Sequence, residues 1–247
     1  MTTITTRTPA QIAERIAAVL DQIFTTIDGW RDRIEHDLAA GFTTALVDEV
    51  AASFAAAALA DDTLNTGAGF VATPGVLDDA QWHLAWWLRA PSGTRRLATI
   101  DDPEHEQFRD YTALEWWRVP ARTGARHLTG PYVDYLCTDD YTVTITTPVR
   151  VDGEMVGVVG TDALVDRLER ELLPLLRSAS GSATIVNASG RVVTSTDPHL
   201  EPGAILRREG LVEALAALRD GAAAHALTGG GRALACGDTS LVLLVES

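Results

Sequence analysis

The stretch from Pro131 to Asp162 constrains the fold of this chain most, because its pattern is that of one long β-hairpin. Two β-rich runs flank Asp152-Gly153. An Asp-Gly pair between alternating runs is typical of a two-residue type I′ turn, which needs positive φ at both residues. If these residues form the loop, Val151 pairs with Glu154 and the ladder continues outward, so we expect two long antiparallel strands.

This register predicts which side chains share a face, because side chains alternate along a strand. At a constant sum of residue numbers, Val149 pairs with Val156, Ile145 with Gly160 and Val143 with Asp162. The first-strand residues on the face of Asp162 are then Tyr141, Val143, Ile145, Thr147 and Val149.

Asp162 thus ends an otherwise apolar row. A buried carboxylate costs several kcal/mol unless a cation or several hydrogen-bond donors meet it. The alternative is that Asp162 faces water and caps a helix over Ala163 to Arg177, since Asp is a favoured N-cap.

The order PYVD, long hairpin, VGVVGTD and helix resembles the double Cache (dCache) sensor domains, which are tandem PAS-like ligand-binding modules of bacterial chemoreceptors and sensor kinases. The resemblance runs from about Thr8 to the C-terminus and is strongest over Tyr111 to Leu176. It implies an α+β fold with a long N-terminal helix and two PAS-like lobes built on antiparallel sheets. We therefore expect a helical stalk over residues 1–66, a ligand-binding lobe over 67–177 and a smaller lobe over 178–247.

The resemblance also implies ligand-binding residues. In members that bind amino acids, an Arg stands two residues before a Trp-Tyr pair, and a Tyr and an Asp follow. Trp116, Trp117, Tyr132 and Asp162 stand at the last four of these positions, with 16 residues from Trp116 to Tyr132 and 30 from Tyr132 to Asp162.

The departures concern the half of the motif that would clamp a carboxylate. Leu114 occupies the Arg position, Trp117 the Tyr position, and Arg109 the place where an earlier Tyr is usual. A replacement guanidinium would have to come from another arginine, for which the candidates are Arg109, Arg118 and Arg126. Tyr141, on the predicted face of Asp162, completes the candidate ligand-binding set.

A carboxylate among aromatic rings favours an ammonium group, because ion pairing adds to a cation–π attraction of about 0.5–2 kcal/mol per ring. We therefore expect a sensor that binds a small amine-containing solute, an amine or an amino acid, and signals through a partner protein. The alternative is a ligand-free dimerisation or interaction module that keeps only the fold. A collapsed cavity filled by Trp116 or Trp117 would be its mark.

The N-terminal segment predicts one long helix. Thr8, Pro9 and Gln11 form a capping box with Pro at the first helical position. A heptad-like apolar stripe follows at Ile16, Leu20, Ile23, Ile27, Trp30 and Ile34. Such a stripe either pairs two copies of the chain in a homodimer or packs on the chain's own sheets.

A second aromatic pair lies in His83 to Arg89, whose sequence alternates like a strand. Neighbouring residues of a strand point to opposite faces, so Trp86 and Trp87 cannot both face one core. One of them is expected at an interface or in the wall of a cavity; the alternative is ordinary core packing of one ring with the other partly exposed.

Composition excludes several classes. The net charge is −14, with 20 Arg and no Lys, which argues against nucleic acid and anionic membranes as partners. The chain has no apolar run long enough to span a bilayer and no signal-peptide pattern, so we expect a soluble, cytoplasmic protein. Its two cysteines, Cys137 and Cys236, are expected to be free thiols.

No catalytic template is present: GxSxG, HExxH, GxGxxG, P-loop and CxxC are all missing from the sequence. His105 lies between two glutamates, but adjacent residues of an extended chain point apart and make a poor metal-ligand set. The sequence therefore predicts a binding protein without catalytic residues, metal or cofactor.

Overall fold

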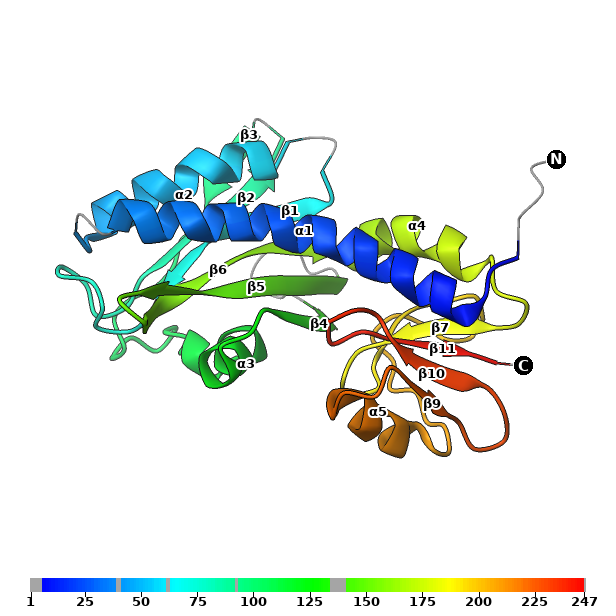
Figure 1. Cartoon of the computed structure of the whole chain (residues 1–247). Helices are drawn as coiled ribbons and strands as arrows, with labels where there is room; N and C mark the ends of the chain where they lie inside the picture. The colour runs from blue at the N-terminus through cyan, green and yellow to red at the C-terminus, as the bar shows by residue number, and fades with distance from the viewer. Residues whose placement is uncertain (1–5, 39–40, 61–62, 92, 134–140, 247) are drawn as a thin grey trace.

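The fold is α+β, with one long helix and two antiparallel sheets, in a computed structural model that describes residues 6–38, 41–60, 63–91, 93–133 and 141–246 (Figure 1). The six-stranded sheet has the order β3-β2-β1-β6-β5-β4, and the five-stranded sheet has the order β8-β7-β11-β10-β9. We call the first sheet with its helices the first lobe and the second sheet with its helix the second lobe. This architecture confirms the predicted fold class.

The first lobe comprises the strands β1 (Asn65–Ala72), β2 (Leu84–Ala90), β3 (Gly93–Arg96), β4 (His127–Val133), β5 (Tyr141–Val151) and β6 (Glu154–Leu164), and the helices α2 (Thr44–Ala58) and α3 (Glu115–Thr123). A 3₁₀ turn, η2 (Tyr111–Ala113), precedes α3. Helix α4 (Val165–Leu176) leads to the second lobe. That lobe comprises β7 (Ala183–Val186), β8 (Val192–Ser195), α5 (Leu211–Arg219), β9 (Ala224–Ala226), β10 (Arg232–Ala235) and β11 (Val242–Val245).

Helix α1 (Pro9–Asp37) runs along both lobes (Figure 1). The predicted capping box is present, with Thr8 accepting from the Gln11 backbone and Gln11 accepting from the Thr8 backbone. Five of the six stripe residues are buried in a core shared with both sheets, and the sixth, Ile23, packs against that core. The stripe is therefore used inside the chain, and homodimerisation stays a prediction that would need another face of α1.

The first sheet has two differently covered faces. Helices α1 and α2 pack on one face, where Phe70, Ile145 and Val159 join the main core. Helix α3 packs on the other face, where Val71, Trp86 and Val158 form a separate cluster with Trp117 and Tyr111. The two faces of the sheet have separate cores. Polar groups on the face that packs against α3 therefore do not interrupt the main core under α1 and α2.

The hairpin turn is as predicted, but its register is not. Asp152 and Gly153 have φ of 53° and 86°, and Val151 pairs with Glu154. A bulge between Val149 and Arg150 then shifts the ladder by one residue. A constant-sum register cannot anticipate this extra residue.

The bulge moves Asp162 to the other face of β5. Asp162 pairs with Thr144, and the predicted partner Val143 pairs with Ala163. Because the pleat has a period of two, a one-residue slip exchanges the faces. Asp162 therefore shares its face with Thr142, Thr144 and Thr146 of β5, and not with Tyr141, Val143, Ile145 and Thr147.

The N-cap prediction for Asp162 is also wrong. Strand β6 continues through Leu164, which is the N-cap of α4 and makes no side-chain cap bond. Asp162 lies inside β6 and is 7% exposed. Strand β1 begins at Asn65 and pairs with β6 over its length.

Strand β4 is an edge of the first sheet and touches the second lobe. Asn187 donates through Nδ2 to the Gly130 carbonyl at 2.6 Å, and Ser240 donates through Oγ to the Leu128 carbonyl at 3.0 Å. Next to β4, the Arg126 guanidinium binds Asp21 of α1 at 2.8 Å and also binds Asp238 of the second lobe. Side chains of the second lobe thus donate to two backbone carbonyls of β4.

Two glycines provide a matched test of this packing. A Cβ on Gly29 of α1 would have nothing within 4 Å, whereas a Cβ on Gly157 would lie 2.3 Å from the Val71 carbonyl oxygen. We expect Gly29→Ala to raise the free energy of unfolding by up to about 1 kcal/mol, because Ala is the better helix former. We expect Gly157→Ala to lower it by about 1–3 kcal/mol through overpacking. Urea denaturation measures both, and equal effects of the two substitutions would contradict the register of β1 and β6.

Candidate functional site

The site is built on a floor of glycines. On the face of the first sheet that packs against α3, Gly69 pairs with Gly160 and Gly67 pairs with Asp162. A Cβ on Gly67 would lie 2.6 Å from Trp86 Nε1 and 2.7 Å from Asp162 Oδ2. Only glycine at position 67 therefore lets the Trp86 indole reach across β1 to the carboxylate on β6.

Asp162 accepts two hydrogen bonds from neutral groups. The Trp86 indole donates through Nε1 to Oδ2 at 3.0 Å, and the Thr144 hydroxyl donates to Oδ1 at 2.6 Å. Because the Thr144 proton is used in this bond, its oxygen accepts from the Tyr132 hydroxyl at 2.5 Å. Four side chains from β2, β4, β5 and β6 thus form one network, which we call the Asp162 network.

These bonds explain how a carboxylate is held at 7% exposure. Each oxygen meets a donor, which offsets part of the desolvation cost. The indole N–H and the hydroxyl are neutral donors, so these two hydrogen bonds themselves bring no positive charge to the carboxylate. Such a carboxylate favours a cationic group that reaches it.

Trp86 is the residue of this network that the motif did not identify. The alternation of His83 to Arg89 puts Trp86 and Trp87 on opposite faces without deciding between them. Trp86 is 6% exposed on the α3 face. Trp87 packs against the main core on the other face, with the Arg96 guanidinium 5.9 Å from its ring centre. The closely spaced Gly67 and Gly69 were the signal for a large side chain crossing β1.

Trp117 lies in the same buried cluster as Trp86 and is 5% exposed. The ring centre of Tyr111 lies 5.3 Å from that of Trp117, and the Tyr111 hydroxyl donates to the Ala72 carbonyl at 2.7 Å. Trp117 therefore belongs to the buried cluster that surrounds Trp86 of the Asp162 network.

Trp116 and Arg109 line a different space, a partly enclosed cavity of about 360 Å³ between β2 and the segment 97–116. We call it the aromatic cavity. The Trp116 backbone carbonyl accepts from the Thr146 hydroxyl at 2.7 Å, which fixes the start of α3 over β5. The Arg109 side chain is exposed and donates to the Phe108 carbonyl at 3.0 Å. Leu114, at the position of the missing Arg, also lines this cavity and is 42% exposed.

Tyr141 lies apart from both places. It is 47% exposed at the start of β5 and borders a surface groove with Leu164, Val165 and Pro202. Its ring would be 2.5 Å from a Cβ on Gly203 of the second lobe. The six predicted residues thus fall into three groups, and the structure brings Tyr132, Asp162 and Trp117 to one region.

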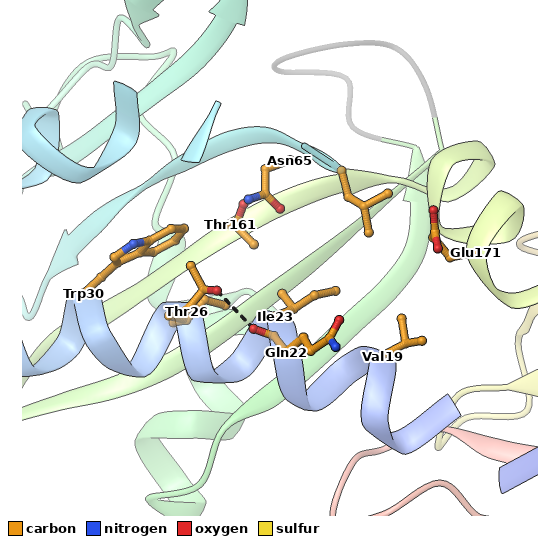
Figure 2. Close-up of a pocket in the computed structure, with 10 residues that line it drawn as sticks. Val19, Gln22, Ile23, Thr26, Trp30, Asn65, Thr161 and Glu171 are labelled. Atoms are coloured by element: carbon orange, nitrogen blue, oxygen red, sulfur yellow. Dashed lines mark hydrogen bonds between the residues drawn. The ribbon is translucent and has the colours of Figure 1, made fainter. Parts of the chain in front are cut away.

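A further groove of about 290 Å³ lies on the opposite face of the sheet, beside α1 (Figure 2). Gln22, Thr26 and Trp30 of α1 line it together with Thr161 of β6 and Glu171 of α4. Thr161 precedes Asp162, and its hydroxyl points the other way and donates to the Gly67 carbonyl at 2.7 Å. This groove is therefore separate from the Asp162 network.

The described residues hold no group of three His, Cys, Asp or Glu side chains arranged to bind a metal ion. Cys236 is a free, buried thiol, and burial raises its pKa to about 12. Cys137 lies outside the described residues. Within the part of the chain that the structure describes, no helix combines the length and apolarity that a bilayer crossing requires.

Known proteins share this architecture. Residues 93–170 match the family model "Methyl-accepting chemotaxis protein-like, first PDC sensor domain". The solved structure of Methyl-accepting Chemotaxis protein X superposes with a TM-score of 0.64 at 18% identity, over 96% of this chain and 94% of that one. The chain has the double Cache fold.

Two more structures with this fold contain a ligand. The ligand-binding domain of the Pseudomonas fluorescens chemoreceptor CtaA, in complex with L-isoleucine, gives a TM-score of 0.56 at 17% identity, covering 96% of this chain and 89% of that one. The sensory domain of the Campylobacter jejuni chemoreceptor Tlp3, with isoleucine bound, gives 0.54 at 14% identity, covering 96% and 89%. Both structures share the double Cache fold that the sequence resemblance predicted.

The hydrogen bond between Trp86 and Asp162 can be tested by a matched pair of substitutions. Trp86→Phe removes the indole N–H and keeps a ring, so we expect the free energy of unfolding to fall by about 1–3 kcal/mol, the cost of depriving a buried acceptor of a partner. Trp87→Phe makes the same change on the other face, where no carboxylate is contacted, and should cost less. Equal losses in urea denaturation would show that the Trp86 N–H contributes nothing specific.

Tyr111 gives this double Cache domain an alkaline limit. Burial raises the pKa of Tyr111 above its ordinary value near 10. Above pH 10 the unfolded chain loses this proton while the folded chain keeps it, so the stabilisation is complete below pH 10 and is lost as the pH rises further. We expect Tyr111→Phe to flatten the decline of the free energy of unfolding between about pH 10 and 11.5. An unchanged slope would contradict this contribution.

Proposed function

We propose that this double Cache domain binds a small amine-bearing solute, an amine or an amino acid, at the Asp162 network and signals through a partner protein. The observation that carries the proposal is a carboxylate at 7% exposure that accepts from the Trp86 indole and is linked through Thr144 to the Tyr132 hydroxyl. An ammonium group would supply the opposite charge and would gain from the aromatic surroundings. The isoleucine-bound structures of the same fold support an amine-bearing ligand class.

Two of the arginines that could bind a ligand carboxylate, Arg109 and Arg126, lie away from the Asp162 network. Leu114 replaces the expected Arg, and Arg109 lies at the aromatic cavity. Arg126 is paired with Asp21 and Asp238 on the α1 side, and its guanidinium lies 4.3 Å from the Phe24 ring. These placements favour a ligand recognised through its amine, with an α-carboxylate contributing little.

A second candidate function is a ligand-free interaction module, and one observation favours it. Both carboxylate oxygens of Asp162 accept hydrogen bonds from the chain itself, so the folded domain does not require a guest for these acceptors. In that case the Asp162 network would serve the fold, and the partner protein would bind without a small molecule.

Calorimetric titration with a panel of primary amines and amino acids separates the two functions. We expect at least one compound to bind with a Kd of about 1 mM or lower. Asp162→Asn should weaken it by at least tenfold, because the charge is removed while the size is kept. Asp238→Asn is the matched control, since it removes a carboxylate that is 72% exposed in the second lobe. The ligand-free module predicts no heat from any compound, and equal effects of both substitutions would reject Asp162 as the binding group.

A further inference from the structure

Strand β4 links the Asp162 network to a residue of the second lobe. The ladder between β4 and β5 shifts its register between Thr129 and Tyr132, so Gly130 lies in an irregular part of the edge strand. The Gly130 carbonyl accepts a hydrogen bond from Nδ2 of Asn187 at 2.6 Å, and Asn187 follows β7 in the second lobe. A strand that carries one member of the network is thus held from the other lobe.

Gly130 is in direct contact with the ring of Tyr132. A Cβ on Gly130 would lie 3.2 Å from Cδ1 of that ring and 2.7 Å from the Thr142 carbonyl oxygen. The φ of Gly130 is 109°, which also favours glycine at this position. The Tyr132 ring therefore packs against the bare α-carbon of Gly130, and a shift of the Gly130 peptide would displace the ring.

The hydroxyl of Tyr132 connects this ring to the buried carboxylate. It bonds to Oγ1 of Thr144 at 2.5 Å, and Thr144 donates to Asp162 at 2.6 Å. Hydrogen bonds weaken steeply when their distance and angle depart from the preferred values. The position of the Tyr132 ring therefore determines how well the Asp162 network is formed, and Gly130 lies against that ring.

The side chain of Asn187 is held in one orientation by its own turn. Asn187 is 6% exposed. Its Oδ1 accepts from the Ser189 backbone at 2.9 Å, from the Ser189 hydroxyl at 2.8 Å and from the Arg191 backbone at 3.0 Å. Because three donors meet the oxygen, the amide nitrogen is the atom that faces Gly130, and a flip of the amide would break all of these bonds. Asn187 is therefore a rigid support for the Gly130 carbonyl.

A second hydrogen bond between the lobes provides a contrast. Ser240 of the second lobe donates to the Leu128 carbonyl of β4 at 3.0 Å. The side chain of Leu128 is buried in the main core, on the face of the sheet that α1 and α2 cover. Of these two bonds to β4, the one from Asn187 thus acts on a residue that touches the Asp162 network, and the one from Ser240 does not.

We propose that Asn187 is a positioning residue of the Asp162 network, whose bond to Gly130 places the Tyr132 ring so that its hydroxyl reaches Thr144. The inference rests on the proposed function, because it makes amine binding in the first lobe depend on a residue of the second lobe. This dependence is reciprocal: an amine that binds better when the Asn187 bond is formed also strengthens that bond by the same factor. The second lobe therefore responds to a guest at the Asp162 network.

Asn187→Asp tests this role with little disturbance of the turn, because a carboxylate oxygen replaces the amide oxygen and only the donor to Gly130 is lost. The probes are L-isoleucine and 2-methylbutylamine, which is the same molecule without its carboxylate. We expect the tighter of the two to bind at least fivefold more weakly to Asn187→Asp in calorimetry. Ser240→Ala is the matched control, since it removes the other bond to β4, and should change the Kd less than twofold.

Thermal melting establishes that each variant is folded at the temperature of the titration. If Asn187→Asp is not, Asn187→Ser takes its place, because a serine hydroxyl can still accept within the turn. Equal losses of affinity in the Asn187 and Ser240 variants would assign the effect to the packing of the lobes in general and would overturn the proposal.

A double-mutant cycle tests the same coupling without a ligand, so that it stands apart from the test of the proposed function. Tyr132→Phe removes the hydroxyl that bonds to Thr144 and should lower the folding equilibrium constant in urea denaturation. With Asn187→Asp already present, we expect that loss to be at least threefold smaller, because the ring is no longer held in place. With Ser240→Ala present, the loss should be unchanged.

Additive effects of Tyr132→Phe and Asn187→Asp would overturn the positioning role. If neither probe binds the original chain but the cycle is non-additive, the proposed function fails and the positioning role of Asn187 stands.

Discussion

The hydrogen bond from the Trp86 indole to Asp162 organises the first lobe, because it ties β2 to β6 across a strand that has no side chain in the way. Gly67 makes the crossing possible, and Thr144 completes the pair of donors on the carboxylate. A buried charge is tolerated only where such donors are fixed. Gly67, the Trp86 indole and the Asp162 carboxylate therefore depend on one another. Gly67 leaves room for the indole, and the indole supplies a donor to the buried carboxylate.

The two faces of the first sheet carry different groups. One face packs on α1 and α2, where the apolar stripe of α1 forms a continuous core with both lobes. The other face carries the Asp162 network and the aromatic cavity under α3. The apolar stripe of α1 has a spacing that suits the pairing of two helices. In this chain it packs against both sheets and joins the two lobes.

The sequence predicted the architecture and the turn at Asp152-Gly153, because local patterns determine both. It did not predict the register, because the bulge beside Val149 changes the face of Asp162 without leaving a local signature. Trp86 was placed on a strand but not assigned to the site, since its contact with Asp162 joins residues on strands that are not neighbours. Tyr141 was a candidate because the assumed register placed it on the face of Asp162. In the observed register it lies on the other face of β5, outside the Asp162 network. The binding roles of Tyr132 and Asp162 stay predictions.

Strand β4 carries Tyr132 and forms an edge of the first sheet. Its Leu128 and Gly130 carbonyls accept hydrogen bonds from Ser240 and Asn187 of the second lobe. An open strand edge is a template on which another chain can add a strand and start aggregation. The second lobe occupies that template, and the opposite edge, β3, is short and bears two arginines. Two carbonyls of one edge strand are thus hydrogen-bonded within the chain, and the other edge is short and charged, which disfavours self-association of the sheet through backbone pairing.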